Sequence, residues 1–212
     1  MPQSLGAAAR NPPLRECAVG FYGKIPSRGD FVRSGLPHGF IDPWDRWMQE
    51  GIAASHAALG DDWVGVWLRA AIWSFALAPG LCGPDAVLGL WLPSVDRVGR
   101  HFSLTLAAVV PGGQLLQLVH DNGGFLGAVE HAGLAALESN ISPDELAALS
   151  RAAVNAEPID PGIDPAQYPD ARALWWTEGA PRVPRQAFAS DALPDAAAFV
   201  KMLDGHDPVD IV

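Results

Sequence analysis

The central part of the chain, residues 71–110, reads AIWSFALAPGLCGPDAVLGLWLPSVDRVGRHFSLTLAAVV. It contains three apolar runs of strand length, at residues 71–77, 87–92 and 102–110. The first connection carries Pro-Gly and Gly-Pro turn signals, and the second is the polar segment 93–101. Because neither connection can hold a crossover helix, we expect neighbouring strands to pair antiparallel.

The residues before this meander predict one strand and one long helix. Residues 18–25 (AVGFYGKI) alternate apolar and small side chains, which is typical of a strand. Asp42 and Pro43 together indicate a helix start, because Asp caps free backbone amides and Pro suits the first helical position. The apolar residues that follow fall on one helical face: Trp44, Trp47, Met48, Ile52 and Leu59. We expect this face to pack on the sheet and the helix to end at Gly60.

The second half of the chain is expected to be mainly helical. Helical spacing predicts a helix over residues 125–137, and a capping-box sequence, Ser-Pro-Asp-Glu, begins another over 142–154. Residues 157–170 contain four prolines and predict a loop. Residues 174–176 then predict a strand near the sheet edge, and residues 194–203 a short terminal helix.

These elements together predict an α+β fold, with a largely antiparallel central sheet and helices packed on it. A length of 212 residues suits a single domain. We expect a flexible leader over residues 1–16 and one domain over residues 17–212. Within that domain, residues 18–110 carry the strand-rich half, and residues 111–212 a helix-rich acidic half.

The net charge of −10 is unevenly distributed. Residues 1–110 carry nine basic and nine acidic side chains, whereas residues 111–212 carry five and fifteen. An acidic surface repels nucleic-acid phosphates and anionic lipids, so neither is expected as a partner. No apolar run reaches the roughly 20 residues of a membrane span, and the N-terminus lacks the pattern of a signal peptide. With Cys17 and Cys82 expected as unpaired core residues, the prediction is a cytoplasmic protein.

Sequence motifs for catalysis, metals or cofactors are absent. His38 with Asp42 and Asp45 could bind a metal, but a helix cap and a surface histidine account for the same residues. Ser94, Asp96 and His101 are the residue types of a hydrolase triad. Triad members normally converge from separate segments, however, and three residues within one loop are more typical of turn chemistry. We therefore expect no enzyme activity, no metal and no cofactor.

Two charged segments are candidates for a binding site: KIPSRGDFVR at residues 24–33 and PSVDRVGRH at residues 93–101. In one interpretation, Asp30 and Asp96 pair with nearby arginines or bond loop amides, which holds the loops rigid. In the other, the arginines present guanidinium groups to the carboxylates of a partner. If both loops emerge at one end of the sheet, they form a single charged patch. The candidate partner-binding residues are Lys24, Arg28, Asp30, Asp96, Arg97 and Arg100.

The same segments carry a resemblance to a known family. GFYGKIPSRGDFVRSGLP, the following PWDRW, and LWLPSVDRVGRHFSLT resemble the signature blocks of the TagF family, also called ImpM, of type VI secretion-associated proteins. WSFALAPGLCG resembles a third block, and LWW near residue 175 a weaker one. The resemblance is strong over residues 18–108. Two positions depart from the family pattern: Ser34 stands where a second arginine is frequent, and His101 where an aromatic is common.

The resemblance implies a function by binding. Members are cytoplasmic α/β proteins, and the best-described ones repress type VI secretion post-translationally by engaging a forkhead-associated scaffold protein, in opposition to a kinase–phosphatase switch. Some relatives carry a fused phosphatase domain, and because 212 residues leave no room for one, we expect this chain to lack phosphatase activity. The expected function is therefore a non-enzymatic repressor. A structural accessory subunit of the apparatus is the alternative, a hydrolase comes third, and the oligomeric state stays open.

Overall fold

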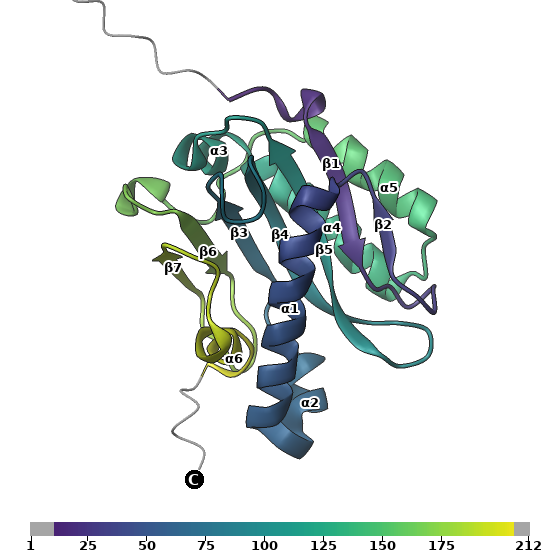
Figure 1. Cartoon of the computed structure of the whole chain (residues 1–212). Coiled ribbons are helices and arrows are strands. Elements are labelled where there is room, and N and C mark those ends of the chain that lie inside the picture. Colours follow the sequence, from purple (N-terminus) through teal and green to yellow (C-terminus); the bar gives the residue numbers. More distant parts are fainter. Residues whose placement is uncertain (1–10, 206–212) are drawn as a thin grey trace, which may run out of the picture.

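The computed structural model describes residues 11–205, and within them a seven-stranded sheet lies between two layers of helices (Figure 1). Its strands are β1 (Ala18–Gly23), β2 (Val32–Ser34), β3 (Trp73–Leu77), β4 (Ala86–Val95), β5 (His101–Val110), β6 (Ala173–Thr177) and β7 (Gln186–Ser190). The strand order is β2-β1-β5-β4-β3-β6-β7, and every neighbouring pair is antiparallel. The predicted α+β fold with an antiparallel sheet is confirmed.

Six α-helices accompany the sheet within the described residues. They are α1 (His38–Leu59), α2 (Trp63–Trp67), α3 (Leu115–Asp121), α4 (Gly123–Glu138), α5 (Pro143–Ala152) and α6 (Ala196–Asp204). Short 3-10 turns occur at Leu14–Glu16, Gly60–Asp62, Ala153–Asn155 and Pro165–Gln167. Residues 1–10 of the expected leader lie outside the described residues, while Leu14 packs into the apolar core.

The two faces of the sheet carry separate apolar clusters. Along β4, Leu88, Leu90 and Leu92 belong to the cluster covered by α3, α4 and α5. Val87 and Trp91 belong to the opposite cluster, which α1, α2 and α6 cover. Because helices bury both faces, the central strands are apolar in consecutive positions rather than alternating with polar residues. This explains the continuous apolar runs in the sequence.

The long helix begins earlier than expected. α1 starts at His38 after Pro37, and the backbone N–H groups of Phe40 and Ile41 both donate to the Pro37 carbonyl. Asp42 is therefore not the cap, and Pro43 lies inside the helix. The extra turn buries Phe40 and Ile41, and each buried side chain contributes about 1.5–3 kcal/mol. This gain offsets the cost of an internal proline, which is about 3 kcal/mol.

The apolar face of α1 is buried as expected, but its contacts extend beyond the meander. The Trp44 indole N–H donates to Thr105 Oγ1 on β5 at 2.9 Å. The Trp47 indole N–H instead donates to the Pro194 carbonyl at 2.7 Å, and its ring lies against Trp175 and Phe199. The helix thus connects the meander to the C-terminal part of the domain.

The sequence does not predict three of the observed elements, and the observed connection between β4 and β5 is shorter than expected. β2 and β7 are short edge strands, and α3 precedes the predicted helix of the second half. The β4–β5 ladder continues to the pair Val95–His101, so only residues 96–100 form the turn. Four of the nine residues of the segment 93–101 are therefore strand rather than loop. The capping box at Ser142 and Glu145 is confirmed and begins α5.

Candidate functional site

The two charged loops meet at one end of the sheet. The β1–β2 loop and the β4–β5 turn lie side by side in Figure 1, and the Arg97 backbone N–H donates to the Arg28 carbonyl at 2.9 Å. The Arg100 guanidinium also donates to the Gly29 carbonyl. Ser94 Oγ donates to the Lys24 carbonyl at 2.7 Å, which joins β4 to the start of the first loop. The expected single patch is present.

Asp96 lies buried beneath this patch and organises it. Lys24 Nζ lies 3.1 Å from Asp96 Oδ2, and Arg100 Nε donates to the same oxygen at 2.7 Å. The other oxygen, Oδ1, accepts from the backbone N–H groups of Val98 and Arg100. The side chains of Lys24 and Asp96 are 7% and 0% exposed, so this pair is inside the protein.

The electrostatics of Asp96 favour its ionised form. Burial alone would raise the pKa of the Asp96 carboxyl, but the hydrogen bonds from Arg100, Lys24 and the Val98 amide outweigh burial. They hold its pKa well below the usual range. A buried charge satisfied on both oxygens fixes the turn geometry. Lys24 and Asp96 therefore act as a structural brace, and Arg100 is part of it.

The remaining charged candidates face solvent. Asp30 does not pair with an arginine, and its Oδ1 accepts from the Phe31 backbone N–H at 2.8 Å. Arg28 donates to the neighbouring Ser27 carbonyl at 3.1 Å. The Arg97 side chain is exposed and forms no hydrogen bond or ion pair with any residue of the described chain. Of the six candidates, Arg28, Asp30 and Arg97 are thus available to a partner.

Two apolar side chains in the same loops were not among the candidates. Phe31 is 42% exposed and Val98 is 65% exposed, although both are large apolar residues. The Phe31 ring stacks on Tyr22 at 5.6 Å and meets the Phe102 ring edge-on at 4.8 Å, so it is held in place. The signal available in the sequence was an apolar residue between charges, in GDFVR and DRVGR.

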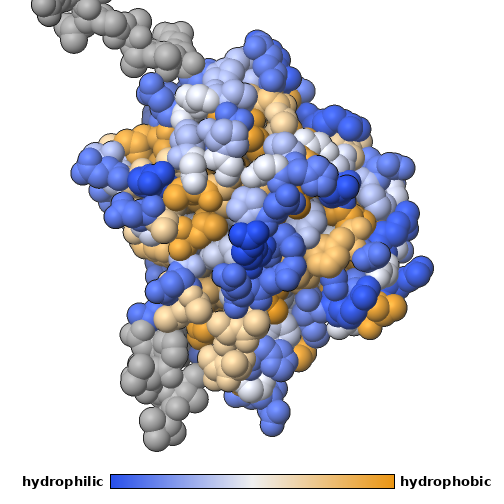
Figure 2. Space-filling view, viewed as in Figure 1, coloured by the Kyte–Doolittle hydropathy of each residue, from blue (hydrophilic) through white to orange (hydrophobic). Residues whose placement is uncertain are grey.

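We name the exposed part of both loops the loop-end surface. It consists of Arg28, Asp30, Phe31, Arg97, Val98 and Arg100. The lower right rim of Figure 2, where these loops lie in Figure 1, is mostly hydrophilic with apolar spots between. Aromatic and arginine side chains on a rigid support are the residues that dominate protein–protein binding energy.

The residues considered for catalysis and metal binding have other partners. Ser94 Oγ and the Asp96 carboxylate are engaged by Lys24 and Arg100, while the His101 ring lies edge-on to Trp63 at 5.2 Å. These three side chains therefore do not form a relay.

One of the two acids considered together with His38 as metal ligands is engaged by other side chains. Asp45 accepts from the Tyr22 hydroxyl at 2.6 Å and from Gln49, whereas Asp42 lies 3.7 Å from His38 at the surface. Within residues 11–205, no group of three or more His, Cys, Asp or Glu side chains has metal-binding geometry. In the same part of the chain, no helix has both the length and the apolar character that crossing a membrane requires.

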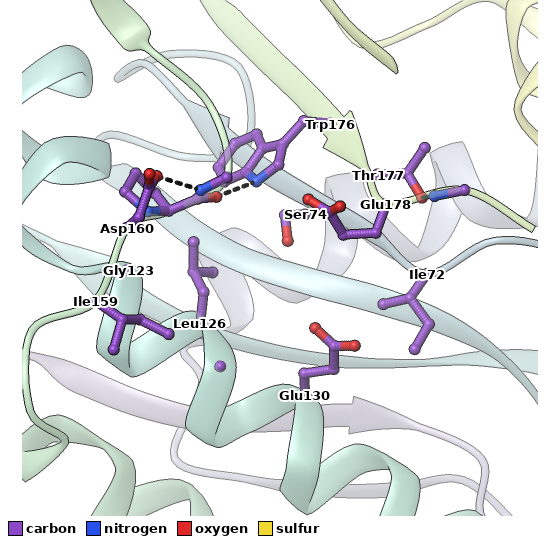
Figure 3. Close-up of a pocket in the computed structure, with 14 residues that line it drawn as sticks. Ile72, Ser74, Gly123, Leu126, Glu130, Ile159, Asp160, Trp176, Thr177 and Glu178 are labelled. Carbon is purple, nitrogen blue, oxygen red and sulfur yellow. Dashed lines mark hydrogen bonds between the residues drawn. The ribbon is translucent and has the colours of Figure 1, made fainter. Parts of the chain in front are cut away.

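A separate cavity of about 280 Å³ lies between α4, the loop at residues 159–162 and strands β3 and β6 (Figure 3). Its walls include the Trp176 ring, whose N–H donates to the Pro161 carbonyl at 3.0 Å. The carboxylates of Glu130 and Glu178 both face the cavity. Burial, with the nearby charge of Glu178, raises the pKa of Glu130. Glu178 is paired with Arg185 at 3.1 Å. No sequence pattern pointed to this cavity.

Comparison with known proteins identifies the family. The model of the TagF N-terminal domain, described as type VI secretion system-associated, matches residues 20–152, which include both charged loops. No curated protein matches the chain. The crystal structure of PA0076 from Pseudomonas aeruginosa PAO1 is 36% identical in sequence, covers 89% of this chain and 94% of its own, and superposes with a TM-score of 0.78. The chain therefore belongs to the TagF family of type VI secretion-associated proteins.

Proposed function

We propose that this chain is a cytoplasmic repressor of type VI secretion that acts after translation, by binding a forkhead-associated scaffold protein through the loop-end surface. Family membership supports the association with type VI secretion. The resemblance of the signature blocks to described repressors supports the direction of regulation and the scaffold as partner.

The observation that carries the proposal is the construction of the loop-end surface. Arg28 and Arg97 are exposed, as are Phe31 and Val98, on two loops that are joined by a backbone hydrogen bond and by the bond from Arg100 to the Gly29 carbonyl. The ion pair of Lys24 with Asp96 holds these loops from inside. A preorganised surface loses little conformational entropy on binding, which is the property a docking site needs.

The first test separates docking from bracing with two arginines of the same turn. Arg97→Ala should leave the melting temperature nearly unchanged and weaken scaffold binding by about 1–3 kcal/mol, as hot-spot arginines do. Arg100→Ala should lower the melting temperature, because it removes a partner of the buried Asp96 carboxylate. Arg151→Ala, an exposed arginine on α5, is the matched control and should change neither quantity. Full scaffold affinity in the Arg97→Ala variant would contradict the proposed docking surface.

The second test separates a repressor from a structural subunit. Deleting the gene should raise secretion if the protein represses, because release of the scaffold permits assembly. If the protein is an accessory subunit, the deletion should lower secretion. Complementation with the Arg97→Ala variant then connects the phenotype to the loop-end surface, since this variant is expected to fold normally.

A further inference from the structure

The strand β7 forms one edge of the sheet, and its outer side is unpaired among residues 11–205. Within the described residues it pairs only with β6, over the regular register from Gln186 to Ser190. Edge strands are usually protected by lysine, proline, a bulge or a covering element. The sequence QAFAS of β7 contains none of the first three. The opposite edge, β2, is only three residues long, and α5 packs against it.

The sequence of this edge is complementary to itself. In an antiparallel pair of two β7 strands centred on Phe188, Arg185 of one copy stands opposite Asp191 of the other. Gln186 then stands opposite Ser190, and the two small alanines stand opposite each other. Opposite charges in directly facing positions stabilise a strand pair, and like charges destabilise it. A two-fold axis at Phe188 places two such favourable charge pairs in one interface.

We propose that two copies of this chain associate through antiparallel pairing of β7 with β7, about a two-fold axis at Phe188, which joins their sheets into one. A two-fold contact uses the same surface on both subunits, so a self-complementary strand is the required feature. The backbone N–H and C=O groups on the outer side of β7 gain partners in this arrangement. No other edge in the described structure offers this combination of length and charge pattern.

The side chains on one face of β7 favour the pairing. Phe188 packs edge-on against Trp73 at 5.7 Å but stays partly exposed. Beside it lies a hollow of about 250 Å³, lined by Trp73, Phe188, Met202 and neighbouring residues of β7 and α6. In the dimer, the Phe188 ring of the second copy lies on this same face and covers the hollow. Facing aromatic side chains add to the stability of a strand pair.

The charged ends of β7 are free to take part. The Arg185 side chain is 64% exposed, and its contacts with Glu178 and the Gly162 carbonyl leave guanidinium donors unused. Asp191 is exposed and forms no hydrogen bond or ion pair with another residue of the described chain. The loop-end surface lies at the ends of β1, β4 and β5, away from β7, so both copies can still present it.

Charge reversal tests the register of the pairing. The full chain should show a concentration-dependent monomer–dimer equilibrium by sedimentation velocity. Asp191→Arg places like charges opposite each other twice, so we expect the dimer dissociation constant to rise about tenfold or more. Arg185→Asp should have the same effect. The double variant, with both charges exchanged, should recover the dimer. Glu50→Arg, an exposed acid on α1, changes the net charge equally and should leave the equilibrium unchanged.

Mixing the two single variants gives the decisive result. An Asp191→Arg chain and an Arg185→Asp chain are complementary at both charge pairs, so the mixture should form a heterodimer that neither variant forms with itself. Circular dichroism and thermal melting confirm that each variant is folded. The proposal is overturned if the full chain stays monomeric at every concentration tested. It is also overturned if a dimer persists unchanged in Asp191→Arg, or if the mixed variants do not associate.

Discussion

The two faces of the sheet bury their apolar surface with different kinds of side chain. The face under α3, α4 and α5 is filled mainly by Leu, Val and Ala. The face under α1, α2 and α6 contains seven of the eight tryptophans. The two layers have similar extent, so the difference lies in chemistry rather than size.

The comparison shows how the side chains of each layer fix the positions of the helices that cover it. On the aromatic face, five of the seven indole N–H groups form directional bonds; Trp47, for example, donates to the Pro194 carbonyl, Trp67 to that of Ser94, and Trp73 to that of Met202. These three bonds link α1, α2 and α6 to defined backbone positions. The indole N–H groups of Trp91 and Trp175 are buried without a partner in the described residues. Aliphatic side chains have no such direction, and volume-conserving changes among them are well tolerated. We therefore expect substitutions in the aromatic layer to lower the free energy of unfolding more than comparable substitutions in the aliphatic layer.

The largest expected effect comes from removing the central indole of the aromatic layer. Trp44 is fully buried and contacts Phe40, Trp47 and Phe75. Trp44→Ala should reduce the free energy of unfolding by about 3–5 kcal/mol, the range for large buried aromatics. Denaturant unfolding measures it. A loss below about 1 kcal/mol would show that this layer adapts like the other one.

A pair of glycine substitutions compares the two layers directly. A Cβ atom at Gly51 on α1 would lie 2.5 Å from the Phe199 ring, which cannot easily move. Gly51→Ala should therefore cost about 1–3 kcal/mol, although alanine favours helix. A Cβ at Gly133 on α4 would meet only leucine methyl carbons, at 3.0 and 3.2 Å. Gly133→Ala should be within about 1 kcal/mol of wild type, because helix propensity offsets the contact. Equal losses of unfolding free energy in the two variants would show that the two layers tolerate an added methyl group equally well.

A smaller effect should come from removing one indole hydrogen bond while keeping an aromatic ring. Trp47→Phe leaves the Pro194 carbonyl without its donor, and the missing bond should cost about 1 kcal/mol. Amide hydrogen exchange should increase in α6, which follows Pro194 directly. Leu90→Met in the aliphatic layer is the control and should leave exchange in α6 unchanged. Unaltered protection of α6 in both variants would argue that indole bonds do not position it.

The smallest effect concerns an ionisable group on the aliphatic side. Glu130 on α4 has a raised pKa in the folded state, chiefly because of burial. As the pH rises above the ordinary pKa of a glutamic acid, Glu130 ionises in the unfolded chain before it does so in the folded protein. The wild type therefore loses stability between this ordinary pKa and the raised pKa of the folded state. Glu130→Gln should therefore be more stable at pH 7, by less than about 1 kcal/mol because the group is partly solvated. The difference should disappear below the ordinary pKa, as seen in unfolding curves at several pH values. A difference that persists in acid would exclude ionisation as its cause.

Local chemistry made most of the fold predictable. The apolar runs of β3, β4 and β5 and the capping box of α5 depend on neighbouring residues, and each was placed within a few positions. The start of α1 was wrong because burial of Phe40 and Ile41 is a tertiary effect that the Asp42–Pro43 signal does not reveal. β7 was missed because only one of its five residues is large and apolar.

The position of the candidate site was predictable from the sequence, but which of its residues are buried and which are exposed was not. Two charged segments at strand ends indicated a joint surface, and the structure brings them together. The burial of Asp96 with Lys24 depends on how tightly β4 and β5 turn, which the sequence does not state. The exposure of Phe31 likewise follows from the rings of Tyr22 and Phe102 that occupy the space below it.

The loop-end surface has a consequence for the timing of protein synthesis. Ser27 Oγ, in the first loop, donates to the Ile141 carbonyl at 2.7 Å, across 114 positions of the chain. The second loop, meanwhile, is joined to the first across about 70 positions. A ribosome-bound chain exposes Arg28 and Phe31 long before Asp96 or Ile141 has emerged. The surface is therefore complete only after the anchoring segments have been released and folded. A partner that requires both loops together would therefore bind the finished molecule and not the nascent chain.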